Sequence, residues 1–175
     1  MKFCNDFFDV SDFKFIHNEI SSMLQDKQTE YRVNLISWNE NLVVSNSPVL
    51  MKALDNDNKI AQMVISKIKN IFDVQKEDDK FSVNIFYWTP GSGINWHDDI
   101  SSDGNQRTAV TIYMNEEWDT DYGGFMVYED ETGFVHAVPP SPNSAVYVEN
   151  NPRHSVSKTT EDAPVRMSIQ VFISQ

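Results

Sequence analysis

Val165-Arg-Met-Ser-Ile-Gln-Val-Phe-Ile173 (VRMSIQVFI), close to the C-terminus, is the stretch that decides how the rest of the chain is arranged. Polar and apolar side chains alternate in it; the polar set is Arg166, Ser168 and Gln170, and the apolar set is Met167, Ile169 and Val171. Alternation with a period of two predicts a β-strand that has one polar and one apolar face. The polar face either lies in water or lines the mouth of a barrel that holds a charged ligand.

Two amphipathic helices are expected upstream of this strand. Apolar residues recur at helical spacing over 13–24, with Ser11 as the expected N-cap, and again over 58–72. A short helical turn is also expected to start at Ser47-Pro48. Each apolar stripe needs an apolar sheet face to pack against, and the last strand supplies one. That requirement favours the alternative in which the polar face of the strand lines a barrel.

Short runs of β-forming residues, separated by turn residues, precede the last strand at 81–88, 108–114, 125–129, 135–138 and 145–148. Many short strands at close spacing predict a β-sandwich or barrel, so the expected fold is mainly β with N-terminal helices. The sequence contains no repeats, low-complexity tracts or linkers. We therefore expect a single domain over 1–175, in which a largely helical N-terminal part, 1–80, supports a β core, 81–175.

The composition limits the partners and the compartment. The 175 residues include 26 acidic and 14 basic side chains, a net charge of −12. This charge would repel the phosphates of a nucleic acid and suits a basic peptide or a neutral small substrate. The single cysteine, Cys4, cannot form an internal disulfide, and the sequence has neither a signal peptide nor an apolar stretch long enough to cross a membrane. We expect a soluble, cytoplasmic protein without a membrane partner.

Three side chains in the second half of the chain have the chemistry of metal ligands. His97 and Asp99 are two positions apart, so on an extended backbone they share a face, while Asp98 points away. His154 follows after enough residues for the chain to return on a neighbouring strand. Two imidazoles and one carboxylate suit Fe(II) and leave positions open for a chelating co-substrate and O₂. The sequence therefore predicts a metal site made of His97, Asp99 and His154.

Arg166 and Ser168 lie on the polar face of the last strand, a short way along the chain from His154. A guanidinium group binds a carboxylate through two parallel hydrogen bonds. The natural ligand for this set is a dicarboxylate that chelates the metal at one end and pairs with Arg166 at the other. The remaining histidines, His17 and His136, are expected to be structural or solvent-facing.

Several short motifs follow one another between 81 and 174: Tyr87 with Pro90-Gly91, His97-Asp98-Asp99, Arg107-Thr108, Ile112-Tyr113-Met114-Asn115 with Trp118, Gly123-Gly124, Pro152-Arg153-His154-Ser155-Val156 and Arg166-Met167-Ser168. Through them this stretch resembles the catalytic domain of the Fe(II)- and 2-oxoglutarate-dependent oxygenases, most closely the prolyl 4-hydroxylase-like group. The resemblance implies a double-stranded β-helix (jelly-roll) core with helices packed on one sheet, which uses Fe(II), 2-oxoglutarate and O₂. It also implies that Tyr113 joins Arg166 at the distal carboxylate of 2-oxoglutarate and that Tyr87 lies close to the iron and the co-substrate.

The activity that the resemblance implies is hydroxylation of an aliphatic C–H bond, at a prolyl residue in a peptide or protein or at free proline. Asp98, Arg107 and the loops 33–45 and 101–106 are candidates for contact with the substrate. The alternatives are an oxygenase that acts on another small molecule, a non-catalytic metal-binding β-barrel module, and a zinc hydrolase with the same ligands. A nucleic-acid demethylase of the same superfamily is disfavoured, because Phe172 stands where that group has a second arginine.

Overall fold

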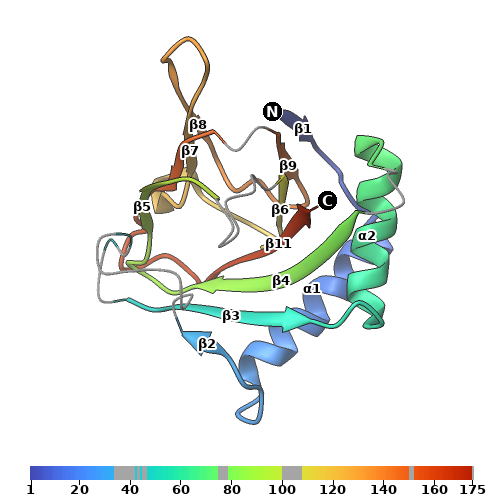
Figure 1. Cartoon of the computed structure of the whole chain (residues 1–175). Helices are drawn as coiled ribbons and strands as arrows, with labels where there is room; N and C mark the ends of the chain where they lie inside the picture. The colour runs from blue at the N-terminus through green and yellow to red at the C-terminus, as the bar shows by residue number, and fades with distance from the viewer. Residues whose placement is uncertain are drawn as a thin grey trace.

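The structure is a computed structural model that describes residues 1–33, 42, 44, 47–74, 79–99, 108–149 and 152–174. Two antiparallel β-sheets dominate these residues (Figure 1). The larger sheet has the order β1 (Lys2–Cys4), β9 (Ala145–Val148), β6 (Thr108–Tyr113), β11 (Arg166–Ser174), β4 (Lys80–Trp88), β3 (Val49–Leu54), β2 (Arg32–Val33). The smaller sheet has the order β5 (Ile94–His97), β10 (His154–Val156), β7 (Met126–Glu129), β8 (Val135–Val138). This mainly β architecture agrees with the fold class expected from the sequence.

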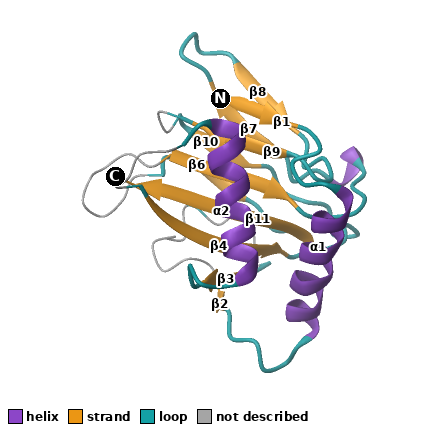
Figure 2. Cartoon of the chain, turned by 90° about the vertical axis from the view of Figure 1, so that its right-hand side faces the viewer, coloured by secondary structure: helices purple, strands orange, loops and turns teal. Residues whose placement is uncertain are grey.

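Two α-helices, α1 (Val10–Gln25) and α2 (Lys59–Phe72), lie on one side of the larger sheet (Figure 2), and a short 3-10 turn, η1 (Thr120–Tyr122), precedes β7. Asp9 caps α1 by accepting a hydrogen bond from the backbone N–H of Asp12, and Asn58 caps α2 through the N–H of Ile60. Ser11, the expected cap of α1, instead donates its hydroxyl hydrogen to Asp9. No helix within the described part of the chain is long and apolar enough to span a membrane.

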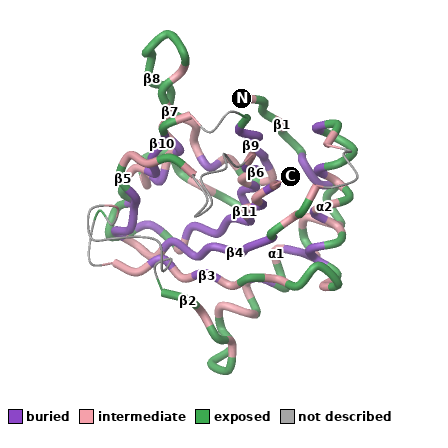
Figure 3. The backbone as a smooth tube through the Cα atoms, viewed as in Figure 1, coloured by how far each residue is buried: buried purple, intermediate pink, exposed green. Residues whose placement is uncertain are grey.

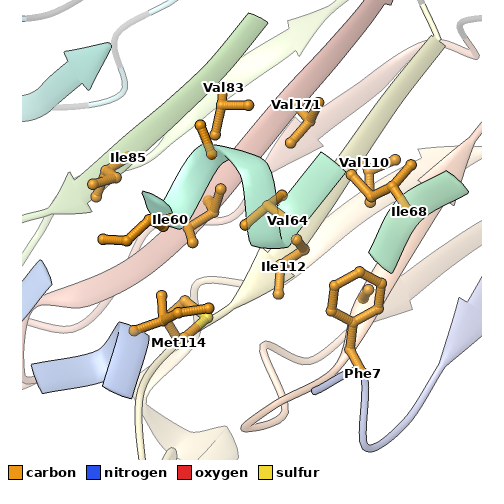
Figure 4. Packing of buried hydrophobic residues seen from close by; sticks show 14 of the residues in the cluster. Phe7, Ile60, Val64, Ile68, Val83, Ile85, Val110, Ile112, Met114 and Val171 are labelled. Atoms are coloured by element: carbon orange, nitrogen blue, oxygen red, sulfur yellow. The ribbon is translucent and has the colours of Figure 1, made fainter. Parts of the chain in front are cut away.

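The main apolar core lies between these helices and the larger sheet. Val64 and Ile68 of α2 are fully buried in the same cluster as Val110 and Ile112 of β6 and Val171 of β11 (Figure 4). Burying side chains of this size contributes about 1.5–3 kcal/mol each, relative to leaving them in water. The helices therefore cover and stabilise the outer face of the larger sheet. Its inner face is left to line a cavity.

Strand β11 has the two different faces that its sequence predicts. It pairs with β4 along its whole length and with β6 over most of it, so it lies in the interior of the sheet. Its apolar set packs in the helix-facing core, whereas its polar set lines a cavity between the two sheets. Figure 3 shows that the strand is buried over most of its length. The polar face therefore points into the protein rather than into water.

The expected helical turn at Ser47-Pro48 is wrong, because the residues that follow form β3. This strand pairs with β4 from Val49 opposite Trp88 to Leu54 opposite Val83. Its exposure alternates at the start, with Val49 and Met51 buried on the cavity side. Proline is tolerated at the start of a strand as well as at the start of a helix, so its presence did not distinguish the two.

Candidate metal centre

Three side chains converge at one end of the smaller sheet. His97 ends β5, Asp99 lies just after it, and His154 begins β10. Their potential ligand atoms all lie within 4.8 Å of one another. His97 and His154 are paired residues on neighbouring strands, and their ring centroids are 4.3 Å apart. The structure therefore brings together all three residues of the metal site that the sequence predicts.

Hydrogen bonds to the backbone fix which nitrogen of each imidazole is free. The Nδ1 of His97 lies 2.8 Å from the carbonyl oxygen of Asn95, and the Nδ1 of His154 lies 2.9 Å from that of Pro152. A carbonyl oxygen can only accept, so each Nδ1 carries the hydrogen and each Nε2 keeps its lone pair. The two Nε2 atoms lie 3.9 and 3.5 Å from the carboxylate oxygens of Asp99. The three groups thus point their electron pairs at a common space.

Burial disfavours the charged form of His97. Burial first, and then the neighbouring His154 ring, hold the pKa of His97 below its ordinary value. A lowered pKa favours the neutral imidazole, which is the form that binds a metal ion. Asp98, in contrast, is exposed, as expected for the residue between two that share a face.

The metal-ligand cluster opens into a cavity between the two sheets, of about 600 Å³ including its open side. Arg166 and Ser168 line it together with the three candidate ligands. The side chain of Arg166 is 1% exposed, and its guanidinium carbon lies 5.2 Å from the ring of Trp88 and 5.0 Å from that of Tyr113. Burial lowers the pKa of Arg166 and raises that of Tyr113. Arginine nevertheless stays charged in proteins, so the cavity contains a buried cation.

Two hydrogen-bond donor atoms of this buried cation lack an acceptor among the described residues. Among the described residues, Arg166 Nε and Nη1 and the hydroxyl of Tyr113 have no hydrogen-bond partner. A buried donor without a partner costs about 1–3 kcal/mol, and more when it is charged. An anionic ligand in the cavity would remove this cost. The arrangement therefore fits a carboxylate that enters the same space as the metal.

Gly124 explains how Arg166 is held in place. Its φ of +70° is in the left-handed region, and a Cβ atom there would lie 2.9 Å from Cδ of Arg166 and 3.0 Å from Cγ2 of Thr159. A side chain at this position would therefore displace the arginine. The backbone of residue 124 packs directly against the aliphatic part of Arg166.

Tyr87 does not lie where the family resemblance implies, and this expectation is corrected. Its side chain is on the helix-facing side of β4, fully buried, and its hydroxyl donates to the carbonyl oxygen of Ile20 at 2.7 Å. In the strand register Tyr87 pairs with Met167, whereas Trp88 pairs with Arg166. Paired residues share a face, so Trp88 lines the cavity and Tyr87 cannot. The alternation of apolar Phe81, Val83 and Ile85 with polar Ser82 and Asn84, continued along the strand, would have assigned Trp88 to the cavity face from the sequence.

The other expected positions fall outside this cluster. His17 bonds through Nδ1 to the carbonyl oxygen of Met114, and His136 lies 2.6 Å from a carboxylate oxygen of Asp130, so neither is a candidate ligand. Within the described ranges, the only group with metal-ligand geometry is the one already named. Arg107, the loop 101–106 and most of the loop 33–45 lie outside the described residues.

A family model described as the 2OG-Fe(II) oxygenase superfamily matches residues 74–174, more than half of the chain. No protein with a curated description matches the sequence.

Solved structures of several prolyl hydroxylases share the fold. A prolyl-4-hydroxylase from Pseudomonas putida matches 99% of this chain and 91% of its own, with a TM-score of 0.77 and 17% identity. A prolyl hydroxylase from Trichoplax adhaerens, in complex with a peptide of hypoxia inducible factor, matches 98% of this chain and 82% of its own, with a TM-score of 0.78 and 12% identity. A viral collagen prolyl hydroxylase from Paramecium Bursaria Chlorella virus-1, in complex with 2OG, matches 98% and 94%, with a TM-score of 0.64 and 11% identity. At these identities the likeness concerns the fold, while the family model covers the strands that contain the site, so the chain belongs to the 2OG-Fe(II) oxygenase superfamily.

Proposed function

We propose that the chain is a dioxygenase that holds Fe(II) through His97, Asp99 and His154, binds 2-oxoglutarate through Arg166, and hydroxylates an aliphatic C–H bond. Its superfamily uses Fe(II), 2-oxoglutarate and O₂. The observation that supports the assignment most strongly is the buried Arg166, whose Nε and Nη1 have no partner among the described residues and which lines the same cavity as the metal-ligand cluster. A zinc hydrolase or a metal-binding module with these ligands has no use for such a cation.

The metal ligands and three further residues of the cavity have defined roles in this proposal. Arg166, Ser168 and Tyr113 bind the distal carboxylate of 2-oxoglutarate, and their burial excludes the water that would compete for it. The two imidazoles present Nε2 to the metal because their Nδ1 atoms are held by the backbone. When bound, Fe(II) and 2-oxoglutarate supply the oxidising chemistry. The protein orients the target carbon and needs no general base.

The proposed substrate is a prolyl residue in a peptide or protein, or free proline. Support comes from the fold neighbours, of which one binds a hypoxia inducible factor peptide and another is a collagen prolyl hydroxylase. The net charge of −12 is compatible with a neutral or basic peptide and unfavourable for nucleic acid. Another small aliphatic substrate is the alternative within the same reaction class.

The proposal is tested by incubating the Fe(II)-loaded protein with 2-oxoglutarate, O₂ and a panel of proline-containing peptides or free proline. The expected products are succinate, CO₂ and a peptide or proline that is one oxygen atom heavier. Succinate formed with no oxygenated product in any prolyl substrate would move the activity to another small molecule. No succinate at all from protein that binds iron would favour the non-catalytic module.

A further inference from the structure

We propose that Trp88 is a positioning residue of the co-substrate site, which fixes the hydroxyl of Ser168 so that this hydroxyl donates its hydrogen to the distal carboxylate of 2-oxoglutarate. This inference rests on the proposed function above and adds to it the residue that sets the direction of the donors. Trp88 belongs to neither the metal-ligand cluster nor the group of residues that would contact the carboxylate.

The hydrogen bond between Trp88 and Ser168 has only one possible direction. The indole Nε1 of Trp88 lies 3.3 Å from Oγ of Ser168. An indole N–H is a donor without acceptor capacity, so Ser168 must accept and its own hydrogen must point elsewhere. Ser168 is 2% exposed, which leaves little access for water. The free hydrogen of Ser168 is therefore available to a ligand in the cavity.

Trp88 also holds the guanidinium group of Arg166. The two residues are paired across β4 and β11, and the guanidinium carbon lies 5.2 Å from the indole ring and 5.0 Å from the ring of Tyr113. Contacts between the cation and these rings hold it in place without using its N–H groups. Within the described ranges, Nε and Nη1 of Arg166 remain as donors without a partner. One tryptophan thus orients two neighbouring groups, Arg166 and Ser168.

Several hydrogen-bond donors meet at this end of the cavity, and within the described part of the chain Nε and Nη1 of Arg166 and the hydroxyl of Tyr113 have no partner. Ser168 adds its own O–H group, since its oxygen accepts from Trp88. An ionised carboxylate has two oxygens that accept from several donors, whereas the nitrogen of a carboxamide adds hydrogens that would face other hydrogens. The site should therefore bind 2-oxoglutarate more tightly than its distal amide, 2-oxoglutaramate. Trp88 should contribute nothing to the affinity for 2-oxopentanoate, which lacks the distal carboxylate.

A double-mutant cycle tests whether Trp88 acts through Ser168. The dissociation constants of 2-oxoglutarate and 2-oxopentanoate are measured anaerobically on Fe(II)-loaded wild-type protein, on Trp88→Phe, on Ser168→Ala and on the double variant. Trp96→Phe is the matched control, because Trp96 packs under Arg153 and does not line the cavity. Thermal unfolding of every variant shows whether the fold is retained.

The expected result is an affinity for 2-oxoglutarate that falls about 3- to 10-fold in Trp88→Phe and about 10-fold or more in Ser168→Ala. The double variant should bind about as weakly as Ser168→Ala, because the phenylalanine ring keeps an aromatic contact with Arg166 and only the effect through Ser168 is lost, and residues that act through one another are not additive. Affinity for 2-oxopentanoate should not change, and Trp96→Phe should behave as the wild type. Wild-type protein should prefer 2-oxoglutarate to 2-oxoglutaramate by about 100-fold or more.

Unchanged affinity in Trp88→Phe, losses that simply multiply in the double variant, or an equal loss for 2-oxopentanoate would each overturn the inference. If one of these results is found while wild-type protein still binds 2-oxoglutarate, the inference falls and the proposed function stands. If wild-type protein binds no 2-oxoglutarate, both fall. Should Trp88→Phe not fold, hydrogen exchange at the Trp88 indole provides the test: it should be slow in wild-type protein and faster in Ser168→Ala, and equal rates would overturn the inference.

Discussion

His97 and His154 lie directly opposite each other on β5 and β10, and each ring is held through Nδ1 by the carbonyl oxygen two residues before it in the sequence. The same local arrangement thus occurs on both strands. It aims both Nε2 atoms at the carboxylate of Asp99, at 3.9 and 3.5 Å. Backbone hydrogen bonds orient the two imidazoles, so the site is preorganised for a metal.

Replacing His154 with Ala should abolish binding of Fe(II) while the protein stays folded, because two ligands alone leave the site incomplete. The measurement is anaerobic calorimetric titration with Fe(II), with circular dichroism to monitor the fold. His136→Ala is the control, since His136 pairs with Asp130 away from the cluster. Undiminished Fe(II) binding in His154→Ala would remove His154 from the metal site.

Replacing Arg166 with Ala should weaken the binding of 2-oxoglutarate by roughly 2–5 kcal/mol, the cost of leaving a buried carboxylate without its charged partner. Affinity for Fe(II) should be unchanged. Lys at the same position should recover only part of the loss, because an ammonium cannot form two parallel hydrogen bonds. The exposed Arg153, which packs over Trp96 outside the cavity, is the control for loss of one positive charge. Equal effects of Arg153→Ala and Arg166→Ala would place the co-substrate elsewhere.

Replacing Gly124 with Ala should both destabilise the protein and weaken 2-oxoglutarate binding, because the new methyl group would meet Arg166 at 2.9 Å. Gly133→Ala is a close control: its φ of +84° imposes similar backbone strain, but the nearest atom to its Cβ would be 4.0 Å away. We expect both variants to lose about 1–3 kcal/mol of unfolding free energy from strain. Only Gly124→Ala should lose affinity, and an unaffected affinity would show that the arginine does not depend on this contact.

Replacing Tyr87 with Phe should leave 2-oxoglutarate affinity unchanged, because Tyr87 lies on the far face of β4. The unfolding free energy at pH 8 should fall by about 1 kcal/mol, since the carbonyl oxygen of Ile20 loses its donor. Tyr113→Phe, in contrast, should weaken the binding of 2-oxoglutarate. Weaker binding of 2-oxoglutarate by Tyr87→Phe would show that Tyr87 belongs to the co-substrate site.

The Tyr87→Phe substitution should also change how the free energy of unfolding depends on pH. Burial raises the pKa of Tyr87 above the value near 10 of the unfolded chain, so the folded protein keeps the phenol protonated when the unfolded chain ionises. Its stabilising effect is present below pH 10 and is lost as pH rises above 10, by at most about 1.4 kcal/mol per pH unit. The difference in unfolding free energy between wild type and Tyr87→Phe should therefore shrink above pH 10. A constant difference would contradict the raised pKa.

The residues of the site could be predicted from the sequence wherever a local pattern decides the face. Two-residue spacing grouped His97 with Asp99 and excluded the exposed Asp98. The same alternation assigned Arg166 and Ser168 to one face of β11, and that face lines the cavity.

The expectation for Tyr87 came from the family resemblance and not from the alternation within its own strand. The first half of the run 81–88 alternates, with Phe81, Val83 and Ile85 apolar and Ser82 and Asn84 polar, and Tyr87 continues the apolar set. Residues 85–88 are all apolar, because one face of β4 packs on the helices and the other lines the cavity, and there the register with β11 decides the face. The strand β3 was missed for a related reason: a short apolar run after a proline is compatible with either a helix or a strand, and pairing with β4 decides it.

The measurement that tests the central proposal most directly is an anaerobic titration of the metal-free protein with Fe(II) and then with 2-oxoglutarate, followed by visible absorption. The expected result is the charge-transfer band of a chelated keto acid in wild-type protein, no band in His154→Ala, and a band in Arg166→Ala only at much higher 2-oxoglutarate concentration. Folded wild-type protein that binds Fe(II) and shows no band at saturating 2-oxoglutarate would contradict the proposal.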